Sequence, residues 1–357
     1  MKKANIILLT VVMLVSGLLI VRCESPQLKG AMIYIQQSQW DKAKNLLLEA
    51  VDVNPQDAKA HFWLGRCYAQ DGEFAKMNQH FEITKKITPK FNKDIDDARQ
   101  YFYRQHFNRG INSFNASLNR QGENRDRLLN QAVEELKIAL IIIKDDINSL
   151  VGLGTAYLQL GKNDEAVKVL QKAIEIDPKN KRALTNLGLY YYNEGVTENK
   201  TEYYKKAVDL FEKVLEIDPG DVKVIQRLAL AYEKIGKTDK AIEAYDKAIA
   251  SFPNNPDLYF NKAALLYEKG EKEEAIKLFN KVIEIAPDDQ DALCNAGYTY
   301  IELENFKEAL PLFERVVKLN PKNKKGWDGL VIVYTRLGMV KEANEALKKS
   351  KELEKNK

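Results

Sequence analysis

Residues 166–191 read AVKVLQKAIEIDPKNKRALTNLGLYY, and residues 241–267 repeat the same phrase as AIEAYDKAIASFPNNPDLYFNKAALLY. Both stretches begin with alanine, carry apolar residues three and four positions apart, and place a proline after the apolar run. This spacing predicts an amphipathic helix, and proline ends a helix because it has no N–H to donate. A chain in which one helical sequence pattern recurs is typical of a repeat architecture.

The prolines that follow apolar runs give the period of the repeat. Pro219, Pro253, Pro287 and Pro321 follow one another at intervals of 34 residues, and 41 residues separate Pro178 from Pro219. Each period holds two amphipathic stretches, which together make one helical hairpin. Such a hairpin cannot bury its apolar face alone, so neighbouring units must stack. The sequence therefore predicts an all-α array of stacked hairpins.

The ends of the helices can be placed from turn residues. Gly161 and Gly236 stand between the two stretches of their units, where the first helix should end in a left-handed glycine. We expect Thr238 or Asp239 to cap the second helix that follows Gly236. The longer interval before Pro219 comes from residues 196–204, VTENKTEYY, which we expect to lengthen one turn by seven residues.

These residues resemble the tetratricopeptide repeat, whose pattern is W-x2-L-G-x2-Y, then A-x3-F, a small residue and P. One unit carries Leu150, Leu153, Gly154, Tyr157, Ala166, Leu170, Ala173 and Pro178, and the next carries Leu184, Leu187, Gly188, Tyr191, Ala207, Phe211, Val214 and Pro219. The resemblance implies a right-handed superhelical α-solenoid of about nine units. Residues 24–91 would hold units 1 and 2, residues 92–146 an irregular unit with insertions, and residues 147–357 units 4 to 9.

The irregular unit is longer than one period. We assign its repeat positions to Gly110, Phe114, Ala132, Leu136 and Ala139. Extra length is expected before these residues, at residues 90–100, and in the turn at residues 119–127. Lys144 stands where the other units have proline.

The first 23 residues have a composition of their own. Two lysines precede an uncharged run from Ala4 to Val21, which is the layout of a signal peptide or a single membrane anchor. A cysteine after such a run resembles a bacterial lipoprotein signal with Cys23 as the lipidated residue, although Arg22 replaces the small residue of that pattern. Lipidation and an uncleaved anchor both stay open. We expect a protein anchored in the cell membrane and facing the periplasm or the exterior of a bacterial envelope.

Composition argues against several other classes of function. The 55 Lys and Arg nearly balance 51 Asp and Glu, and the two signs are interspersed, so no one-sided basic face for nucleic acid is expected. The three histidines and three cysteines show no metal-ligand spacing. Cys67 and Cys294 fall within helical patterns and are predicted to be buried thiols. We expect no catalytic site, metal or cofactor.

Partner binding in arrays of the resembled family uses the concave face formed by the first helix of each hairpin. The resemblance assigns this groove to Asn186, Tyr192, Lys223, Arg227, Phe260, Asn261, Tyr267, Asn295 and Tyr298. Asn186, Lys223 and Arg227 match part of a carboxylate clamp, in which cations hold a carboxylate by charge-assisted hydrogen bonds. Val151 and Thr155 stand where the other half of the clamp needs Lys and Asn. A solvated groove wall is the alternative interpretation.

The sequence thus predicts a membrane-tethered scaffold for a protein or peptide ligand. Two alternatives stay open: a regulatory or catalytic component of cell-envelope biogenesis, and a co-chaperone of the carboxylate-clamp type. The repeats leave only the irregular unit for a catalytic role, which favours the scaffold.

Overall fold

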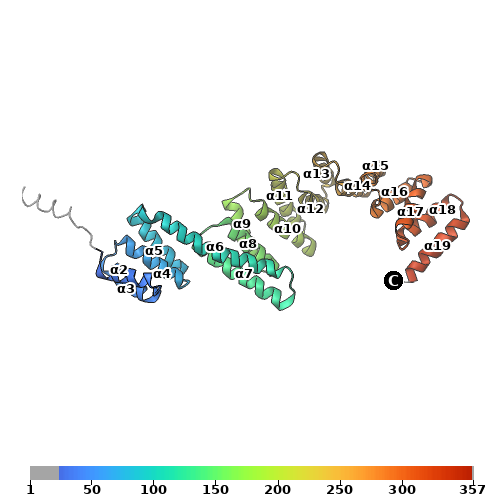
Figure 1. Ribbon diagram of the computed structural model, residues 1–357. Coiled ribbons are helices and arrows are strands. Elements are labelled where there is room, and N and C mark those ends of the chain that lie inside the picture. The colour runs from blue at the N-terminus through green and yellow to red at the C-terminus, as the bar shows by residue number, and fades with distance from the viewer. Residues whose placement is uncertain (1–23, 356–357) are drawn as a thin grey trace, which may run out of the picture. The chain divides into compact units, whose positions relative to one another are not determined.

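The computed structural model describes residues 24–355, and this part of the chain is helical throughout, with no strand (Figure 1). Its helices follow one another as nine hairpins, which confirms the predicted all-α array. The chain divides into two compact units, the first ending at Ala166 and the second beginning at Val167. None of the helices in residues 24–355 is both long and apolar enough to span a bilayer.

The first unit contains α2 (Pro26–Gln36), α3 (Trp40–Val53), α4 (Ala58–Gln70), α5 (Phe74–Ile87), the short 3₁₀ helix η1 (Pro89–Phe91), α6 (Asn92–Ser117), α7 (Gly122–Ile142) and α8 (Ile147–Gln159). The boundary between the units falls inside α9 (Asn163–Ile176). The second unit continues with α10 (Lys181–Glu198), α11 (Thr201–Ile217), α12 (Val222–Lys234), α13 (Thr238–Ser251), α14 (Pro256–Lys269), α15 (Lys272–Ile285), α16 (Gln290–Glu302), α17 (Phe306–Leu319), α18 (Lys324–Arg336) and α19 (Val340–Lys355). Even-numbered helices are the first helices of the hairpins, and odd-numbered helices are the second.

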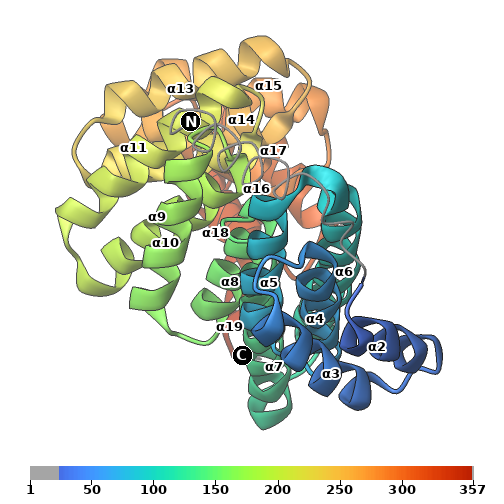
Figure 2. The ribbon, with the colours of Figure 1, turned by 90° about the vertical axis from the view of Figure 1, so that its left-hand side faces the viewer.

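Consecutive helices pack on one another in both units. Figure 2 shows α2 to α5 of the first unit side by side, and each of them contacts the next. In the second unit α11 packs on α10 within its hairpin and on α12 of the next hairpin. Within each unit, neighbouring hairpins therefore cover one another's apolar faces, as a solenoid requires.

Turns and caps differ between the two helices of a hairpin. Gly161 and Gly236 have φ of 69° and 72°, which confirms the predicted left-handed turns. Six first helices (α4, α10, α12, α14, α16 and α18) begin at an acidic or amide cap two residues after a proline, such as Asp221, whose side chain accepts from the Val224 N–H. The predicted caps of the second helix are wrong: α13 begins at Thr238, and its N-cap residue, Lys237, makes no side-chain hydrogen bond. The turn is closed by the backbone instead, because the Lys237 N–H donates to the Tyr232 carbonyl at 2.8 Å.

Small residues of the repeat lie where helices approach most closely. A Cβ added at Gly188 would lie 2.7 Å from the Phe211 ring, and one added at Gly297 would lie 2.6 Å from the Phe313 ring. Both phenylalanines are fully buried. A larger residue at either glycine would push the two helices of its hairpin apart.

Two recurrent hydrogen bonds join neighbouring hairpins, and the repeat pattern alone does not predict either of them. The first runs from an aromatic residue to the proline carbonyl six residues before it: Tyr259 to Pro253 at 2.9 Å and Trp327 to Pro321 at 2.9 Å. The second joins a tyrosine of a first helix to a side chain twenty residues earlier, as in Tyr334 to Glu314 at 3.0 Å. These bonds satisfy polar groups at the seams between repeats.

The insertion at residues 196–204 lengthens two helices and not a turn. α10 runs to Glu198 and α11 starts at Thr201, so only Asn199 and Lys200 connect them. Asn199 adopts a left-handed conformation with φ of 50°, which an asparagine tolerates. The prediction of a longer turn is wrong because the inserted residues bury Tyr204 against the extended α10, with Gly195 leaving room for its ring.

The irregular unit also gains its extra length as helix. α6 is 26 residues long and α7 is 21 residues long. The expected turn insertion is largely helical, since α7 begins at Gly122. The added first turns of α6 bury Ile95 and Phe102 in the same core as Phe81 of α5, and this contact explains why the extra residues are ordered.

Candidate functional site

The nine residues assigned to the groove all lie on first helices of the second unit. They are Asn186 and Tyr192 on α10, Lys223 and Arg227 on α12, Phe260, Asn261 and Tyr267 on α14, and Asn295 and Tyr298 on α16. α10 contacts α12 and α16 contacts α18, so neighbouring first helices share a surface. Cys23, the predicted lipidation residue, lies outside the described residues.

Arg227 and Tyr192 are the two predicted residues that the structure brings into direct contact. The guanidinium carbon of Arg227 lies 5.3 Å from the centre of the Tyr192 ring, which is within cation–π range. Tyr192 itself is only 7% exposed, because Tyr204 of the lengthened α11 packs edge-on against it. Tyr192 therefore forms the wall under Arg227 and offers a ligand little surface of its own.

Lys223 and Arg227 are the exposed cations of the site. They stand four residues apart on α12, and within residues 24–355 neither forms an ion pair. Two like charges at this spacing repel each other by about 0.2–0.5 kcal/mol on a helix surface. Asn186, the third member of the partial clamp, is half-buried and already engaged in an interaction. The arrangement offers two uncompensated cations to an anion.

Tyr267 is held by residues that the repeat pattern did not single out. Its hydroxyl donates to Glu302 on α16, and Lys272 on α15 forms an ion pair with the same carboxylate at 2.8 Å. The hydrogen bond to Glu302, together with burial, raises the pKa of Tyr267 to about 12. The pKa of Glu302 is lowered, chiefly by its hydrogen bond with Lys272, so this carboxylate stays charged at neutral pH. The 35-residue spacing of Tyr267 and Glu302, one period plus one, is the sequence signal that could have found the pair.

The other aromatic groove residues are also anchored. Phe260 is half-buried with its ring 5.7 Å from that of Phe279 in an edge contact. Tyr298 donates to the Lys325 carbonyl at 2.8 Å and lies edge-on to Phe313. Burial raises the pKa of Tyr298 to about 12. These rings are already fixed in orientation. Less side-chain entropy is therefore lost when a ligand binds.

The two remaining asparagines differ in exposure. Asn295 is exposed on α16, whereas Asn261 is half-buried on α14. Exposed Asn295 therefore joins Lys223 and Arg227 as a polar group open to a ligand. Leu230, one turn after Arg227 and 38% exposed, adds an apolar contact next to these polar groups.

Among the described residues, the two cysteines and the acidic side chains show no sign of a metal or nucleophilic site. No group of three or more His, Cys, Asp or Glu side chains in residues 24–355 is placed to hold a metal ion. Cys67 and Cys294 are buried thiols, as predicted, and burial raises their pKa values to about 12 and about 11. A thiol of this kind is a poor nucleophile, because the thiolate is the reactive form.

A histidine pair lies in the first unit between α4 and α5. The Nδ1 atoms of His61 and His80 are 2.8 Å apart, and His61 Nε2 lies 3.1 Å from the Pro55 carbonyl oxygen. A carbonyl requires a donor, so His61 carries its proton on Nε2 and accepts from His80 Nδ1. Burial lowers the pKa of both histidines, that of His80 to about 4. The pair is therefore neutral at pH 7.

Comparison with curated proteins finds relatives of very different kinds. The chain is 24% identical over 192 residues to anaphase-promoting complex subunit 3 of Schizosaccharomyces pombe, a match that covers 52% of this chain and 25% of that protein. It is 27% identical over 158 residues to the protein O-mannosyl-transferase TMTC3 of Mus musculus, with 43% of this chain and 16% of that protein covered. The matches thus span at most a quarter of either relative.

Solved structures give matches of similar extent. The peptide-binding TPR protein YrrB is 25% identical with a TM-score of 0.44, over 54% of this chain and 96% of that chain. PilF of Pseudomonas aeruginosa is 18% identical with a TM-score of 0.46, over 64% of this chain and 97% of that chain.

Family models described as tetratricopeptide or TPR repeats match residues 28–76, 154–195, 182–221, 202–246, 227–290 and 291–323. Together these ranges cover more than half of the chain, and they coincide with the helical hairpins seen in the structure. The chain therefore belongs to the tetratricopeptide repeat family, whose arrays of hairpins are scaffolds for protein interaction.

Proposed function

We propose that this protein is an extracytoplasmic scaffold, tethered to a membrane by its N-terminus, that binds an extended peptide or a partner helix in the groove of its second unit. The observation that carries the binding proposal is the pair of exposed, unpaired cations, Lys223 and Arg227, on the first-helix face of α12. Their mutual repulsion is relieved when an anionic group binds between them. The ligand is therefore a segment with an acidic side chain or a terminal carboxylate.

Neighbouring side chains suit the rest of such a segment. Leu230 offers apolar surface one turn away from Arg227, and Asn295 offers an amide that can bond to a peptide backbone. The Tyr192 ring lies under Arg227, and Tyr298 follows Asn295 by one turn on α16. Each of the two rings is held by an edge contact with a buried ring. A rigid wall with a few exposed polar groups is typical of a preorganised peptide site.

The membrane tether rests on the sequence of residues 1–23. A run without charge from Ala4 to Val21 follows two lysines, and Cys23 follows the run. The first helix of the described residues, α2, begins at Pro26. If Cys23 bears the anchor, the array starts directly at the membrane, and the groove of the second unit lies further along the chain.

The binding proposal is tested by photo-crosslinking in the native cell. Leu230 is replaced by p-benzoylphenylalanine, and Lys277, whose side chain is 66% exposed on the second helix α15, is replaced in the control. We expect a discrete adduct from position 230 only, and its loss when Arg227→Glu is added. Adducts from neither position, or from both alike, would rule out a groove ligand.

The tether is tested by fractionation with Cys23→Ser. The cells are also fed labelled palmitate: a lipid anchor predicts that the unaltered protein takes up label and Cys23→Ser does not, whereas an uncleaved anchor predicts label in neither. Recovery of the unaltered protein from the soluble cytosolic fraction would contradict the tether altogether.

A further inference from the structure

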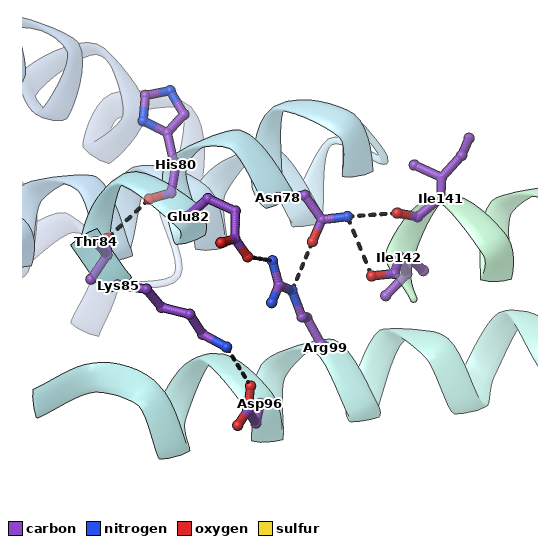
Figure 3. Close-up of polar contacts among 9 residues, drawn as sticks. All are labelled: Asn78, His80, Glu82, Thr84, Lys85, Asp96, Arg99, Ile141 and Ile142. Carbon is purple, nitrogen blue, oxygen red and sulfur yellow. Dashed lines mark hydrogen bonds and ion pairs between the residues drawn. The ribbon is translucent and has the colours of Figure 1, made fainter. Parts of the chain in front are cut away.

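A cleft of about 650 Å³ opens on the first unit between the second helices α5 and α7, with the early part of α6 beside them (Figure 3). α5 contributes Asn78 and Glu82, α6 contributes Asp96 and Arg99, and the end of α7 contributes residues 140–144. All of these residues belong to the irregular unit or to the helix that precedes it. The cleft is distinct from the groove of the second unit.

The apolar wall of the cleft comes from the way α7 ends. Three isoleucines in succession, residues 141–143, precede Lys144, which takes the place of the usual proline. Ile142 enters the core, Ile143 is half-buried, and Ile141 is left 47% exposed. An exposed isoleucine beside a half-buried one gives the cleft surface that favours an apolar side chain.

This end of α7 is held in place by α5. The Asn78 amide donates to the Ile141 carbonyl at 2.5 Å and lies 3.3 Å from the Ile142 carbonyl, as the dashed lines in Figure 3 show. The last carbonyls of a helix have no partner within it, so a side chain from another helix satisfies them here. The apolar wall is therefore fixed before any ligand binds.

Arg99 forms the polar end of the cleft. Its Nε donates to Asn78 Oδ1 at 2.8 Å and its Nη2 donates to Glu82 Oε1 at 2.7 Å, while its guanidinium lies 5.8 Å from the centre of the Phe81 ring. The third nitrogen, Nη1, has no partner among the described residues, and in Figure 3 no dashed line reaches it. A guanidinium fixed through two nitrogens presents the third as a preorganised donor.

Once the ion pairs around the cleft are counted, the charge left without an opposite partner is positive. Glu82 is matched by Arg99, and Asp96 is matched by Lys85 at 2.9 Å. Lys144 is exposed and forms no ion pair in the described part of the chain. What is left for a ligand is an apolar wall next to the Arg99 Nη1 donor and the Lys144 ammonium.

We propose that this cleft binds the C-terminal residue of a partner polypeptide. A large apolar side chain packs on Ile141 and Ile143, and the terminal carboxylate accepts hydrogen bonds from Arg99 Nη1 and Lys144 Nζ. The apolar surface is limited to the last turn of α7, and the rest of the rim carries Glu82 and Asp96. One apolar side chain covers that turn, whereas a long acyl chain would also lie against the two carboxylates, which disfavour it.

The test uses the full chain in nonionic detergent and a fluorescein-labelled hexapeptide, GSGSGI, with either a free or an amidated C-terminus. Fluorescence anisotropy should show that the free acid binds at least tenfold more tightly than the amide. Lys144→Glu should weaken binding of the acid about tenfold, and Ile141→Ser severalfold. Ile33→Ser, which alters another exposed isoleucine on α2, is the matched control and should change nothing.

The variants avoid Arg99 because that side chain also ties α5 to α6. Equal binding of acid and amide, absence of binding at millimolar peptide, or an unchanged affinity in Lys144→Glu would overturn the proposal. Displacement of the peptide by dodecanoate at lower concentration than by unlabelled peptide would also overturn it, in favour of a fatty acid. Because the proposed groove also takes a terminal carboxylate, the titrations are repeated in the Arg227→Glu background. Lys144→Glu should weaken binding there by the same factor, which separates this site from the groove.

Discussion

Arg227 of α12 reaches across to the preceding first helix and lies over the ring of Tyr192, 5.3 Å from its centre. Tyr192 is buried by the lengthened hairpin of α10 and α11, so the insertion that makes this hairpin longer also fixes the position of the cation. A local irregularity in one repeat thus shapes the candidate site on the next.

Lys223→Glu should make the α12 helix more stable while it weakens binding of the groove ligand. The change replaces repulsion between Lys223 and Arg227 with an attractive pair at the same four-residue spacing, and should stabilise α12 by about 0.5 kcal/mol. It should also abolish the groove adduct, because an acidic ligand meets a carboxylate. Hydrogen exchange of the α12 amides measures the first effect, since repeat arrays need not unfold in one step.

The control for this variant should change helix stability in the opposite direction. Lys277→Glu on α15 removes an ion pair with Glu274 three residues away and places like charges there. It should lower the stability of α15 by a few tenths of a kcal/mol and leave the adduct intact. If Lys223→Glu also destabilises its helix, the two cations are not in repulsion and the site has lost its electrostatic basis.

Tyr267→Phe should show how the α14 and α16 helices are joined. The variant removes the donor to Glu302 but leaves the ion pair of that carboxylate with Lys272. The loss of one hydrogen bond to a charged group should cost about 1.5–3 kcal/mol at most, and less here because Glu302 is exposed. Urea unfolding followed by hydrogen exchange on α14 and α16 checks this, and protection unchanged on both helices would contradict it.

The period of the repeat made the hairpins, their order and their glycine turns predictable, because each depends on residues close together in the chain. Gly236 needs only its own backbone to end α12. The fate of residues 196–204 was not predictable in this way, because whether an insertion becomes loop or helix depends on burial, here that of Tyr204. The sequence alone does not show where such burial will occur.

Site residues divide along the same line. The family resemblance assigned Lys223 and Arg227 to the groove face of α12, and the structure finds both side chains exposed. It did not distinguish Tyr192 as buried, and it did not find Glu302, because both depend on which side chain of the neighbouring repeat lies opposite. Such pairs are set by the packing angle between hairpins, which the spacing of residues does not encode.

Asn199→Val should destabilise the lengthened hairpin, whereas Asn199→Gly should not. Asn199 has a φ of 50°, and a β-branched residue in this conformation costs about 1–2 kcal/mol, which glycine avoids. Limited proteolysis within residues 196–204 should be faster in the valine variant. Equal rates in both variants would mean that the connection between α10 and α11 does not depend on this left-handed residue.

Acid should destabilise the first unit through the histidine pair. The folded-state pKa of His80 is lowered to about 4 from 6.5, so between these values the unfolded chain binds more protons than the folded one. The stabilisation is complete above pH 6.5 and is lost as the pH falls toward 4. Because the His80 ring is only partly buried and solvent screens its charge, the loss at pH 5 should be about 1 kcal/mol, below the roughly 2 kcal/mol that the full shift would give. Hydrogen exchange on α4 and α5 between pH 7 and pH 5 measures this loss, after correction for the intrinsic exchange rate.

His80→Phe is the variant that isolates this effect. Phenylalanine keeps a ring between those of His61 and Tyr68, on which His80 stacks at 5.1 Å and 5.4 Å, but it cannot take up a proton. The pH dependence of α4 and α5 should therefore become shallower, leaving the smaller contribution of His61, whose pKa burial also lowers. A slope as steep in His80→Phe as in the unaltered protein would place the acid sensitivity at other groups.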